Sequence, residues 1–192
     1  MTTDPSPSLI LLDRDGVLNE DRPDYVRSAD QWVWVPGARE ALARLAAAGV
    51  RVGVVSNQAC VGKGLVAAAT LEAIHARMRR EAEAAGGRID AVFVCPHTDD
   101  ADCDCRKPAP GLLRRAADHF GMDLAGVPFV GDARRDLDAA IAAGARPVLV
   151  RTGKGADTEA AGPPSEAAVY PDLPAFVADL LGEDRQGKET AC

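Results

Sequence analysis

Short apolar runs rich in valine, leucine and isoleucine alternate along this chain with longer alanine-rich segments of helical periodicity. The apolar runs predict strands at residues 9–12, 50–55, 89–94, 128–130 and 148–150. The alanine-rich segments predict helices near residues 37–48, 70–85, 110–120, 134–143 and 173–181. Such alternation is typical of a parallel sheet covered by helices. The sequence therefore predicts an α/β fold with a central parallel sheet.

Two carboxylates, Asp13 and Asp15, directly follow the apolar run 9–12. Alternate side chains of a strand point to one side, and Gly16 lets the backbone turn sharply after them, so both carboxylates can face one site. In open parallel sheets, ligands bind outside the carboxyl ends of the strands. Because Asp-x-Asp-Gly alone is a weak pattern, a strand followed by an acidic turn is the competing interpretation.

The second predicted strand ends in Ser56, Asn57 and Gln58, which offer a hydroxyl and two amides. Short polar donors at a strand end suit a phosphate group. An ordinary loop start is the alternative for Ser56 taken alone.

The run 128–130 leads to Asp132, with Asp136 four residues later. Hard cations such as Mg²⁺ prefer carboxylate and carbonyl oxygens, so Asp132 can join Asp13 around a cation. For Asp136, a stabilising charge at the start of a helix is a competing interpretation.

Three thiols and one imidazole crowd into one short loop. They are Cys95, His97, Cys103 and Cys105, and Arg106-Lys107-Pro108 follows at once. The set matches a closed Cys₃His zinc site of the structural type. Free thiols are the alternative, and a disulfide is disfavoured because nothing suggests export and Cys60 and Cys192 are remote.

The zinc is predicted to have a positional function. Residues 99–104 contain four aspartates and no apolar core residue, so they have little reason to order without a metal. With zinc bound, Arg106 and Lys107 are fixed beside the last ligand, and both cations are aimed at the active site.

The ordered segments LILLDRDGV, VVSNQ, CRKP and FVGDARRD resemble the motifs of the haloacid dehalogenase superfamily of phosphohydrolases. The resemblance covers residues 9–152 and implies a Rossmann-like three-layer sandwich. It implies that Asp13 is the nucleophile and Asp15 the general acid/base. Further implied roles are phosphoryl binding by Ser56 and Lys107, and Mg²⁺ binding by Asp13, the backbone carbonyl of Asp15, and Asp132.

The zinc loop before Arg-Lys-Pro resembles that of two phosphatase branches, which act on D-glycero-D-manno-heptose 1,7-bisphosphate and on histidinol phosphate. Residues 57–64 and 148–155 resemble the heptose branch, although Ala59, Cys60 and Lys63 depart from its usual Ser, Gly and Arg. That branch implies removal of the C7 phosphate, leaving the 1-phosphate, on the way to nucleotide-activated heptose for lipopolysaccharide or another surface glycan.

Several polar residues are candidates for contact with a sugar phosphate. Arg106 and Lys63 could bear on a second phosphate or on sugar hydroxyls, and Asn19 lies in a stretch suited to a polyol. Asn57 and Gln58 complete the predicted substrate-binding set. A solvated surface role is the alternative for Arg106, Lys63 and Asn19.

Motif spacing predicts the absence of a cap domain. Only 42 residues separate Asp13 from Ser56, and a loop and one helix consume them. Loops are therefore expected to enclose the substrate, chiefly residues 20–35 with Trp32 and Trp34. Packing at the core edge is the alternative for both tryptophans.

Length and charge limit the remaining function classes. We expect one domain over residues 1–182, a Gly/Pro/Ala-rich loop at 153–168 and a disordered polar tail at 183–192. The net charge of −7 and the lack of a basic run disfavour a nucleic-acid substrate. Without a signal peptide or spanning segment, a cytoplasmic monomer acting on a small phosphorylated sugar is expected.

Two alternatives from other classes stand beside this prediction. One is a non-catalytic zinc-bearing binding module, against which the complete set of catalytic residues argues. The other is a phosphatase acting on nucleic-acid ends, for which neither a basic groove nor interleaved aromatics is visible. Among enzymatic functions, hydrolysis of histidinol phosphate is the alternative to hydrolysis of the heptose bisphosphate. That substrate would demand an acidic partner for its amine.

Overall fold

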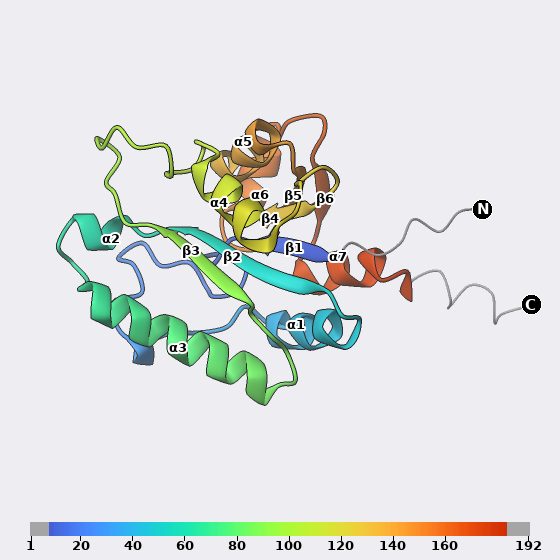
Figure 1. The fold of residues 1–192 in the computed structure, drawn as a ribbon, viewed down its shortest axis with the longest axis horizontal. Coiled ribbons are helices and arrows are strands. Elements are labelled where there is room, and N and C mark those ends of the chain that lie inside the picture. Colours follow the sequence, from blue (N-terminus) through green and yellow to red (C-terminus); the bar gives the residue numbers. More distant parts are fainter. Residues whose placement is uncertain (1–7, 184–192) are drawn as a thin grey trace, which may run out of the picture.

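Six parallel strands form the centre of the molecule in the computed structural model, which describes residues 8–183 (Figure 1). The strands are β1 (Leu9–Leu12), β2 (Arg51–Asn57), β3 (Ala91–Cys95), β4 (Pro128–Gly131), β5 (Arg146–Val150) and β6 (Ala168–Tyr170). Their order in the sheet is β3-β2-β1-β4-β5-β6. The chain adds β2 and β3 on one side of β1 and then crosses over to add β4, β5 and β6 on its other side. As a result, β1 and β4 lie side by side although more than a hundred residues separate them.

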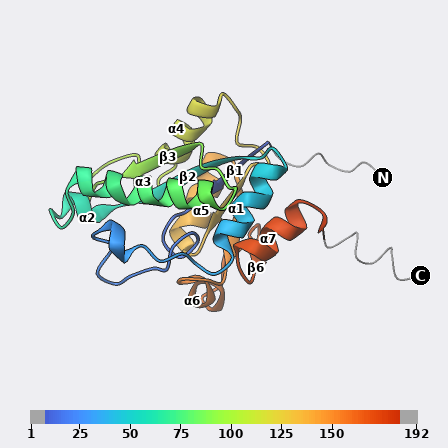
Figure 2. The same ribbon diagram turned by 90° about the horizontal axis from the view of Figure 1, so that it is seen from below.

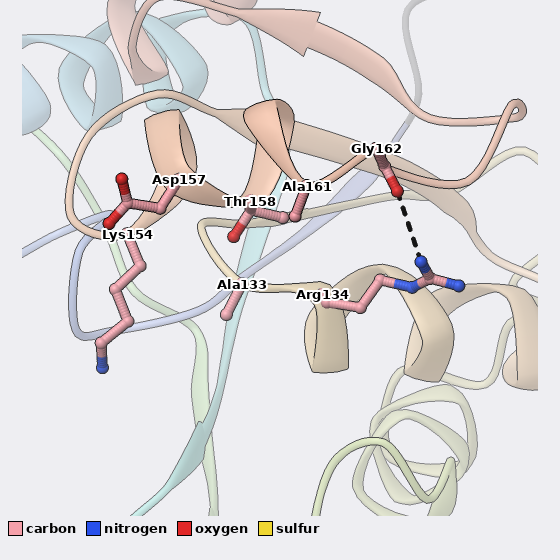
Figure 3. A pocket seen from close by; sticks show the side chains of 7 residues that line it. All are labelled: Ala133, Arg134, Lys154, Asp157, Thr158, Ala161 and Gly162. Atoms are coloured by element: carbon pink, nitrogen blue, oxygen red, sulfur yellow. Dashed lines mark hydrogen bonds between the residues drawn. The ribbon is translucent and has the colours of Figure 1, made fainter.

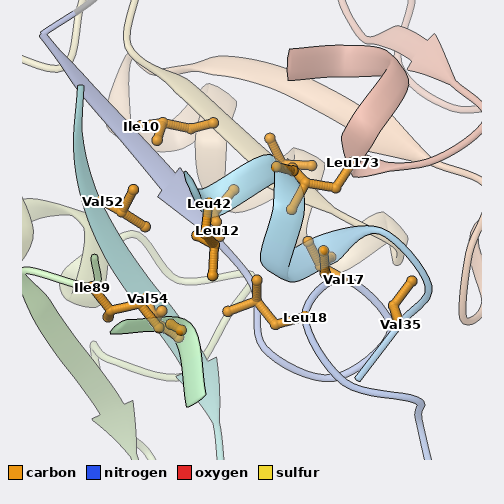
Figure 4. Close-up of a cluster of buried hydrophobic side chains, with 14 of the residues drawn as sticks. Ile10, Leu12, Val17, Leu18, Val35, Leu42, Val52, Val54, Ile89 and Leu173 are labelled. Atoms are coloured by element: carbon orange, nitrogen blue, oxygen red, sulfur yellow. The ribbon is translucent and has the colours of Figure 1, made fainter. Parts of the chain in front are cut away.

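Helices cover both faces of this sheet (Figures 1 and 2). On one face α1 (Ala38–Ala47), α3 (Ala68–Ala84) and α7 (Leu173–Leu180) pack against Ile10 and Leu12 (Figure 4). On the other face α4 (Gly111–Phe120) and α5 (Arg134–Ala143) pack against Leu9 and Leu11. Since alternate side chains of one strand enter opposite layers, the four buried residues of β1 join two cores. The predicted three-layer α/β sandwich is confirmed.

The predicted loop at 153–168 is wrong in part, because it contains the short helix α6 (Gly155–Ala160) and is followed by the unpredicted edge strand β6. Six and three residues are too few to show a clear period. Thr158 also anchors α6 by donating a hydrogen bond to the Asp132 carbonyl oxygen at 2.8 Å, a tertiary contact that no local pattern reveals. A one-turn helix α2 (Ala59–Gly62) and a 3-10 turn η1 (Ala29–Gln31) were likewise not predicted.

Neither interval between the motifs contains an inserted domain, as the spacing predicts. Between β1 and β2 the chain forms only η1 and α1, and between β2 and β3 only α2 and α3. Trp32 is buried in the core, and the Trp34 indole packs edge-on against it and donates to Glu81 at 2.7 Å. These two aromatics therefore pack at the edge of the core, as the alternative interpretation predicts.

Among residues 8–183, the helices are all too short or too polar to traverse a lipid bilayer. The predicted disordered tail lies outside the described residues, apart from Glu183.

Candidate active site

Three buried carboxylates meet at the carboxyl ends of β1 and β4. Asp13 follows β1, Asp132 follows β4, and Asp136 lies in the first turn of α5. One oxygen from each lies within 4.8 Å of the others. Pairing of Leu12 with Val130 sets this meeting, because it aligns the two strand ends. The expected approach of Asp132 to Asp13 is thus present, and Asp136 joins them.

Lys107 inserts its ammonium group between two of these acids. Its Nζ lies 2.9 Å from Asp13 Oδ1 and 2.8 Å from Asp136 Oδ1, and it donates to the Val55 carbonyl oxygen at 2.9 Å. Burial disfavours the charged form of this lysine, but the two carboxylates outweigh burial and raise its pKa above the ordinary value. Lys107 therefore stays charged beside the predicted nucleophile.

The Asp132 carboxylate has one satisfied oxygen and one open one. Its Oδ2 accepts a hydrogen bond from the Lys154 backbone N–H at 2.8 Å, whereas its Oδ1 is buried without a partner among the described residues. A Cβ atom on Gly16 or Gly153 would lie 2.1 or 2.2 Å from Oδ2, so both glycines are required by close packing. An unpartnered buried oxygen in an acidic cluster suits a hard divalent cation.

Burial also disturbs the acidity of these carboxyls. It raises the pKa of Asp13 to about 6 despite the opposing charge of Lys107. Burial, together with the charges of Asp13 and Asp136, raises the pKa of Asp132 to about 7. Crowded carboxylates favour a proton or a cation between them. The donor set thus fits the Mg²⁺ that the sequence predicts.

Three side chains hold Asp15 by donating hydrogen bonds to its carboxylate. Arg14 Nη2 donates to its two oxygens at 2.8 and 3.0 Å, Asn19 Nδ2 donates at 2.9 Å, and Gln58 Nε2 donates at 2.8 Å. Burial opposes ionisation of Asp15, but the Arg14 charge and these hydrogen bonds outweigh it and lower its pKa. The carboxylate is therefore fixed in one orientation.

Arg14 is itself buried, with 1% of its surface exposed. Its Nη1 lies 3.4 Å from His75 Nε2 on α3, and its guanidinium lies 5.9 Å from the centre of the Trp32 ring. Burial and the Arg14 charge lower the pKa of His75 to about 4, so the imidazole is neutral and accepts from the guanidinium. Arg14 was not predicted as a site residue, because nothing in Asp-x-Asp-Gly shows that the middle side chain turns inward.

The polar residues at the end of β2 are bonded to the rest of the site. Gln58 Nε2 donates to Ser56 Oγ at 2.8 Å as well as to Asp15. Asn57 exchanges two hydrogen bonds with the backbone of Lys107, at 3.0 and 3.1 Å. Gln58 thus links Ser56 to Asp15, and Asn57 ties β2 to the segment that carries Lys107.

Cys95, His97, Cys103 and Cys105 converge as the sequence predicts, with one ligand atom from each within 4.8 Å of the others. Measured separations are 3.2 Å from Cys95 Sγ to Cys105 Sγ, 3.8 Å from Cys95 Sγ to Cys103 Sγ and 3.2 Å from His97 Nδ1 to Cys105 Sγ. A tetrahedron with metal–sulfur bonds of about 2.3 Å has edges of about 3.8 Å, so the four atoms are close to that arrangement.

The remaining candidates lie at the rim. Lys63 donates to the Tyr25 hydroxyl at 2.8 Å, and Tyr25 adopts a positive φ of 65°. Arg106 donates to the His97 carbonyl oxygen at 3.3 Å and pairs with Asp99. Both cations are thus bonded to nearby loop residues, and neither forms a hydrogen bond or ion pair with the three clustered carboxylates.

Comparison with known proteins places this arrangement in a family. A family model described as HAD-hydrolase-like matches residues 104–183. The D-glycero-β-D-manno-heptose-1,7-bisphosphate 7-phosphatase of Pseudomonas putida is 46% identical over 173 residues, which cover 90% of this chain and 99% of that protein. The crystal structure of D,D-heptose 1,7-bisphosphate phosphatase from B. bronchiseptica, complexed with magnesium and phosphate, is 48% identical, with a TM-score of 0.90 over 92% of this chain and 99% of that one. The chain belongs to the haloacid dehalogenase superfamily.

This haloacid dehalogenase protein is a phosphatase, a phosphoric monoester hydrolase, like its named relatives. The alternative of a non-catalytic binding module is thereby not supported. A β-phosphoglucomutase from Clostridium difficile shares only 11% identity at a TM-score of 0.59, and that likeness shows the fold alone.

Proposed function

We propose that this phosphatase removes the C7 phosphate from D-glycero-D-manno-heptose 1,7-bisphosphate and leaves heptose 1-phosphate. The proposal rests on the meeting of Asp13, Lys107 and Asp132 at the carboxyl ends of the strands. The chain also matches heptose-1,7-bisphosphate 7-phosphatases over nearly its whole length. The product would serve the synthesis of nucleotide-activated heptose for a surface glycan.

Asp13 is the proposed nucleophile, and it forms an aspartyl-phosphate. Its Oδ1 accepts the Arg14 backbone N–H at 2.7 Å and pairs with Lys107, which leaves Oδ2 without a protein donor among residues 8–183. That oxygen attacks phosphorus, and the bond to the sugar oxygen breaks. Lys107 and Ser56 hold the phosphoryl oxygens on which negative charge develops.

Asp15 is the proposed general acid/base. It gives a proton to the departing sugar alkoxide and then takes one from the water that hydrolyses the aspartyl-phosphate. The acid step needs a protonated carboxyl, and the negative charge of an incoming phosphate raises the pKa of Asp15 toward that form. Help of this kind is worth about 10²–10⁴-fold in rate.

Two metals belong to the proposal. Asp13, Asp132 and the Asp15 carbonyl would hold Mg²⁺, which supplies positive charge where the anionic phosphate approaches the nucleophile. Cys95, His97, Cys103 and Cys105 would hold a structural Zn²⁺. The residues after the last thiolate, Arg106 and Lys107, then keep fixed positions.

For the sugar contacts, we propose Lys63 and Arg106 at the rim, and Asn19, Asn57 and Gln58 nearer the catalytic groups. Asn19 and Gln58 already donate to Asp15, and Asn57 bonds Lys107, so their effect on substrate is expected to act largely through those residues. We also propose that the protein acts as a cytoplasmic monomer with one domain over residues 1–182 and without a nucleic-acid partner.

Phosphate release with Mg²⁺ tests the proposal, with heptose 1,7-bisphosphate and histidinol phosphate assayed side by side. Wild-type protein should prefer the bisphosphate strongly, and Asp13→Asn should abolish release from both substrates. A preference for histidinol phosphate would replace the proposed substrate. Full activity of the Asp13→Asn protein would remove Asp13 from its role.

A further inference from the structure

A recess of about 360 Å³ opens between the zinc loop and the start of α5. Arg106 and Lys107 line it from the loop, and Arg135 lines it from the helix. Neither Asp13 nor Ser56 lines the recess. Because Lys107 also pairs with Asp13, an anion held in this recess lies beside the proposed nucleophile.

The Arg135 guanidinium has no hydrogen-bond acceptor among the described residues. Among residues 8–183 its guanidinium makes no recorded hydrogen bond or ion pair, and its Nε is buried without a partner. Lys107, by contrast, is committed to two carboxylates, and Arg106 is paired with Asp99. A half-buried guanidinium whose donors find no acceptor among the described residues is costly, so the recess suits an anion from outside the chain.

The adjacent Arg134, also in the first turn of α5, differs from Arg135 because its donors have acceptors within the protein. Its Nε donates to Asp138 at 2.8 Å, and its Nη1 donates to the Gly162 carbonyl oxygen at 3.4 Å, in a different pocket of about 400 Å³ (Figure 3). Arg134 does not line the recess that Arg135 lines. The two neighbours therefore form a matched pair for an experiment.

The chemistry of the recess favours a phosphate. A guanidinium presents a planar fork that matches two oxygens of a phosphate group, and two arginines on different elements can grip it from two sides. The carboxylates of Asp136, Asp13 and Asp132 outweigh the burial of Arg135 and raise its pKa, so its charge is permanent. A neutral sugar hydroxyl would leave most of the guanidinium donors without an acceptor.

We propose that Arg135 is a specificity-determining residue, which together with Arg106 binds the non-reacting phosphate of a sugar bisphosphate. This inference rests on the proposed function and adds a residue to it. Arg135 thereby separates bisphosphate from monophosphate substrates without taking part in the transfer itself.

Steady-state kinetics on two substrates test the proposal. We would assay heptose 1,7-bisphosphate and heptose 7-phosphate with wild type, Arg135→Ala, Arg135→Lys and the control Arg134→Ala. Loss of a charge-assisted contact should lower kcat/KM for the bisphosphate by about 10- to 100-fold in Arg135→Ala, mostly through KM. The monophosphate values should be unchanged, Arg135→Lys should be intermediate because it lacks the fork, and Arg134→Ala should match wild type.

Equal losses on both substrates would overturn the proposal, because Arg135 would then serve the transferred phosphoryl group. No loss on either would overturn it as well. A binding measurement separates this outcome from failure of the proposed function: calorimetric titration of the bisphosphate into Asp13→Asn protein, with and without Arg135→Ala. If wild type hydrolyses neither heptose phosphate, the proposed function fails, and an unchanged affinity in the double variant would overturn the role of Arg135 independently.

Discussion

At the residue scale, the contact between sequence neighbours Arg14 and Asp15 has the largest consequence for chemistry. His75 and Trp32 contact the Arg14 guanidinium and fix its position. Rotation of the Asp15 carboxylate would therefore break its hydrogen bonds to Arg14. Asp15 also receives hydrogen bonds from Asn19 and Gln58. The proposed acid/base is therefore positioned by three side chains, and Arg14 is the one among them with no proposed contact to the substrate.

Arg14→Met should impair proton transfer more than phosphate binding. Removing a hydrogen-bonded charge should lower the first-turnover rate with heptose 1,7-bisphosphate by about 10- to 100-fold. First-turnover release of nitrophenol from p-nitrophenyl phosphate should fall far less, because that leaving group needs no proton. Rapid-quench and stopped-flow measurements give the two rates.

The Asp15→Ala variant sets the reference for this experiment, since it should show the same dependence on leaving group. Thermal unfolding of the Arg14→Met protein establishes that it is folded. Equal losses with both substrates would mean that Arg14 only supports the structure.

At the element scale, the loop between β3 and α4 is organised by its thiols. Cys95 and Cys105 are buried in the core cluster that contains Leu112 and Phe129, whereas the aspartates between them face outward. The loop thus has two buried anchor points and a charged span. The order of the loop depends on what joins these anchor points, while the adjacent Lys107 is held both by the loop and by its hydrogen bonds to Asn57.

Removal of the proposed zinc should therefore lower kcat by displacing Arg106 and Lys107. Treatment with a strong chelator, or the Cys103→Ser change, should lower both bound zinc and kcat, while far-UV circular dichroism stays near that of the untreated protein. Zinc content per chain by mass spectrometry is the direct measurement. Cys60→Ser is the matched control, because Cys60 lies outside the cluster and its loss should leave zinc content unchanged.

Strand ends and helix periods are readable in the sequence, and so five of the six strands, the five long helices and the order of the motifs were predicted. The convergence of the four zinc-loop residues was also predicted, because few soft ligands lay so close together. Arg14, His75 and Arg135 were not, since their roles come from burial and from contacts between distant elements. The Gln58 amide shows the same limit: its residue type was noticed, but not its bridge from Ser56 to Asp15.

At the scale of the whole molecule, the acidic cluster opposes folding. Asp132 has a pKa of about 7 in the folded protein and an ordinary value of 3.8, so the folded state binds more protons across that interval. Its contribution to stability is full below pH 4 and is lost as the pH rises through 7. The loss amounts to about 4 kcal/mol at most, by the usual conversion of pKa into free energy.

Asp132→Asn should therefore raise the free energy of unfolding at pH 8 without added Mg²⁺, and it should flatten the dependence of that free energy on pH between 4 and 7. Urea unfolding at several pH values provides the measurement. Mg²⁺ should stabilise wild type and not the variant. Asp138→Asn, on α5 and paired with Arg134, is the control and should keep the wild-type pH dependence. An Asp132→Asn protein less stable than wild type at pH 8 without added Mg²⁺ would contradict the expectation.

The order of the strands has a consequence for synthesis on the ribosome. The first half of the chain to emerge contains β1, β2 and β3, and in it β1 has one open edge until β4 follows more than a hundred residues later. Two residue pairs, Leu11 with Phe129 and Leu12 with Val130, close that edge. The same closure brings Asp132 to Asp13, so the proposed active site is complete only after both halves of the sheet have joined.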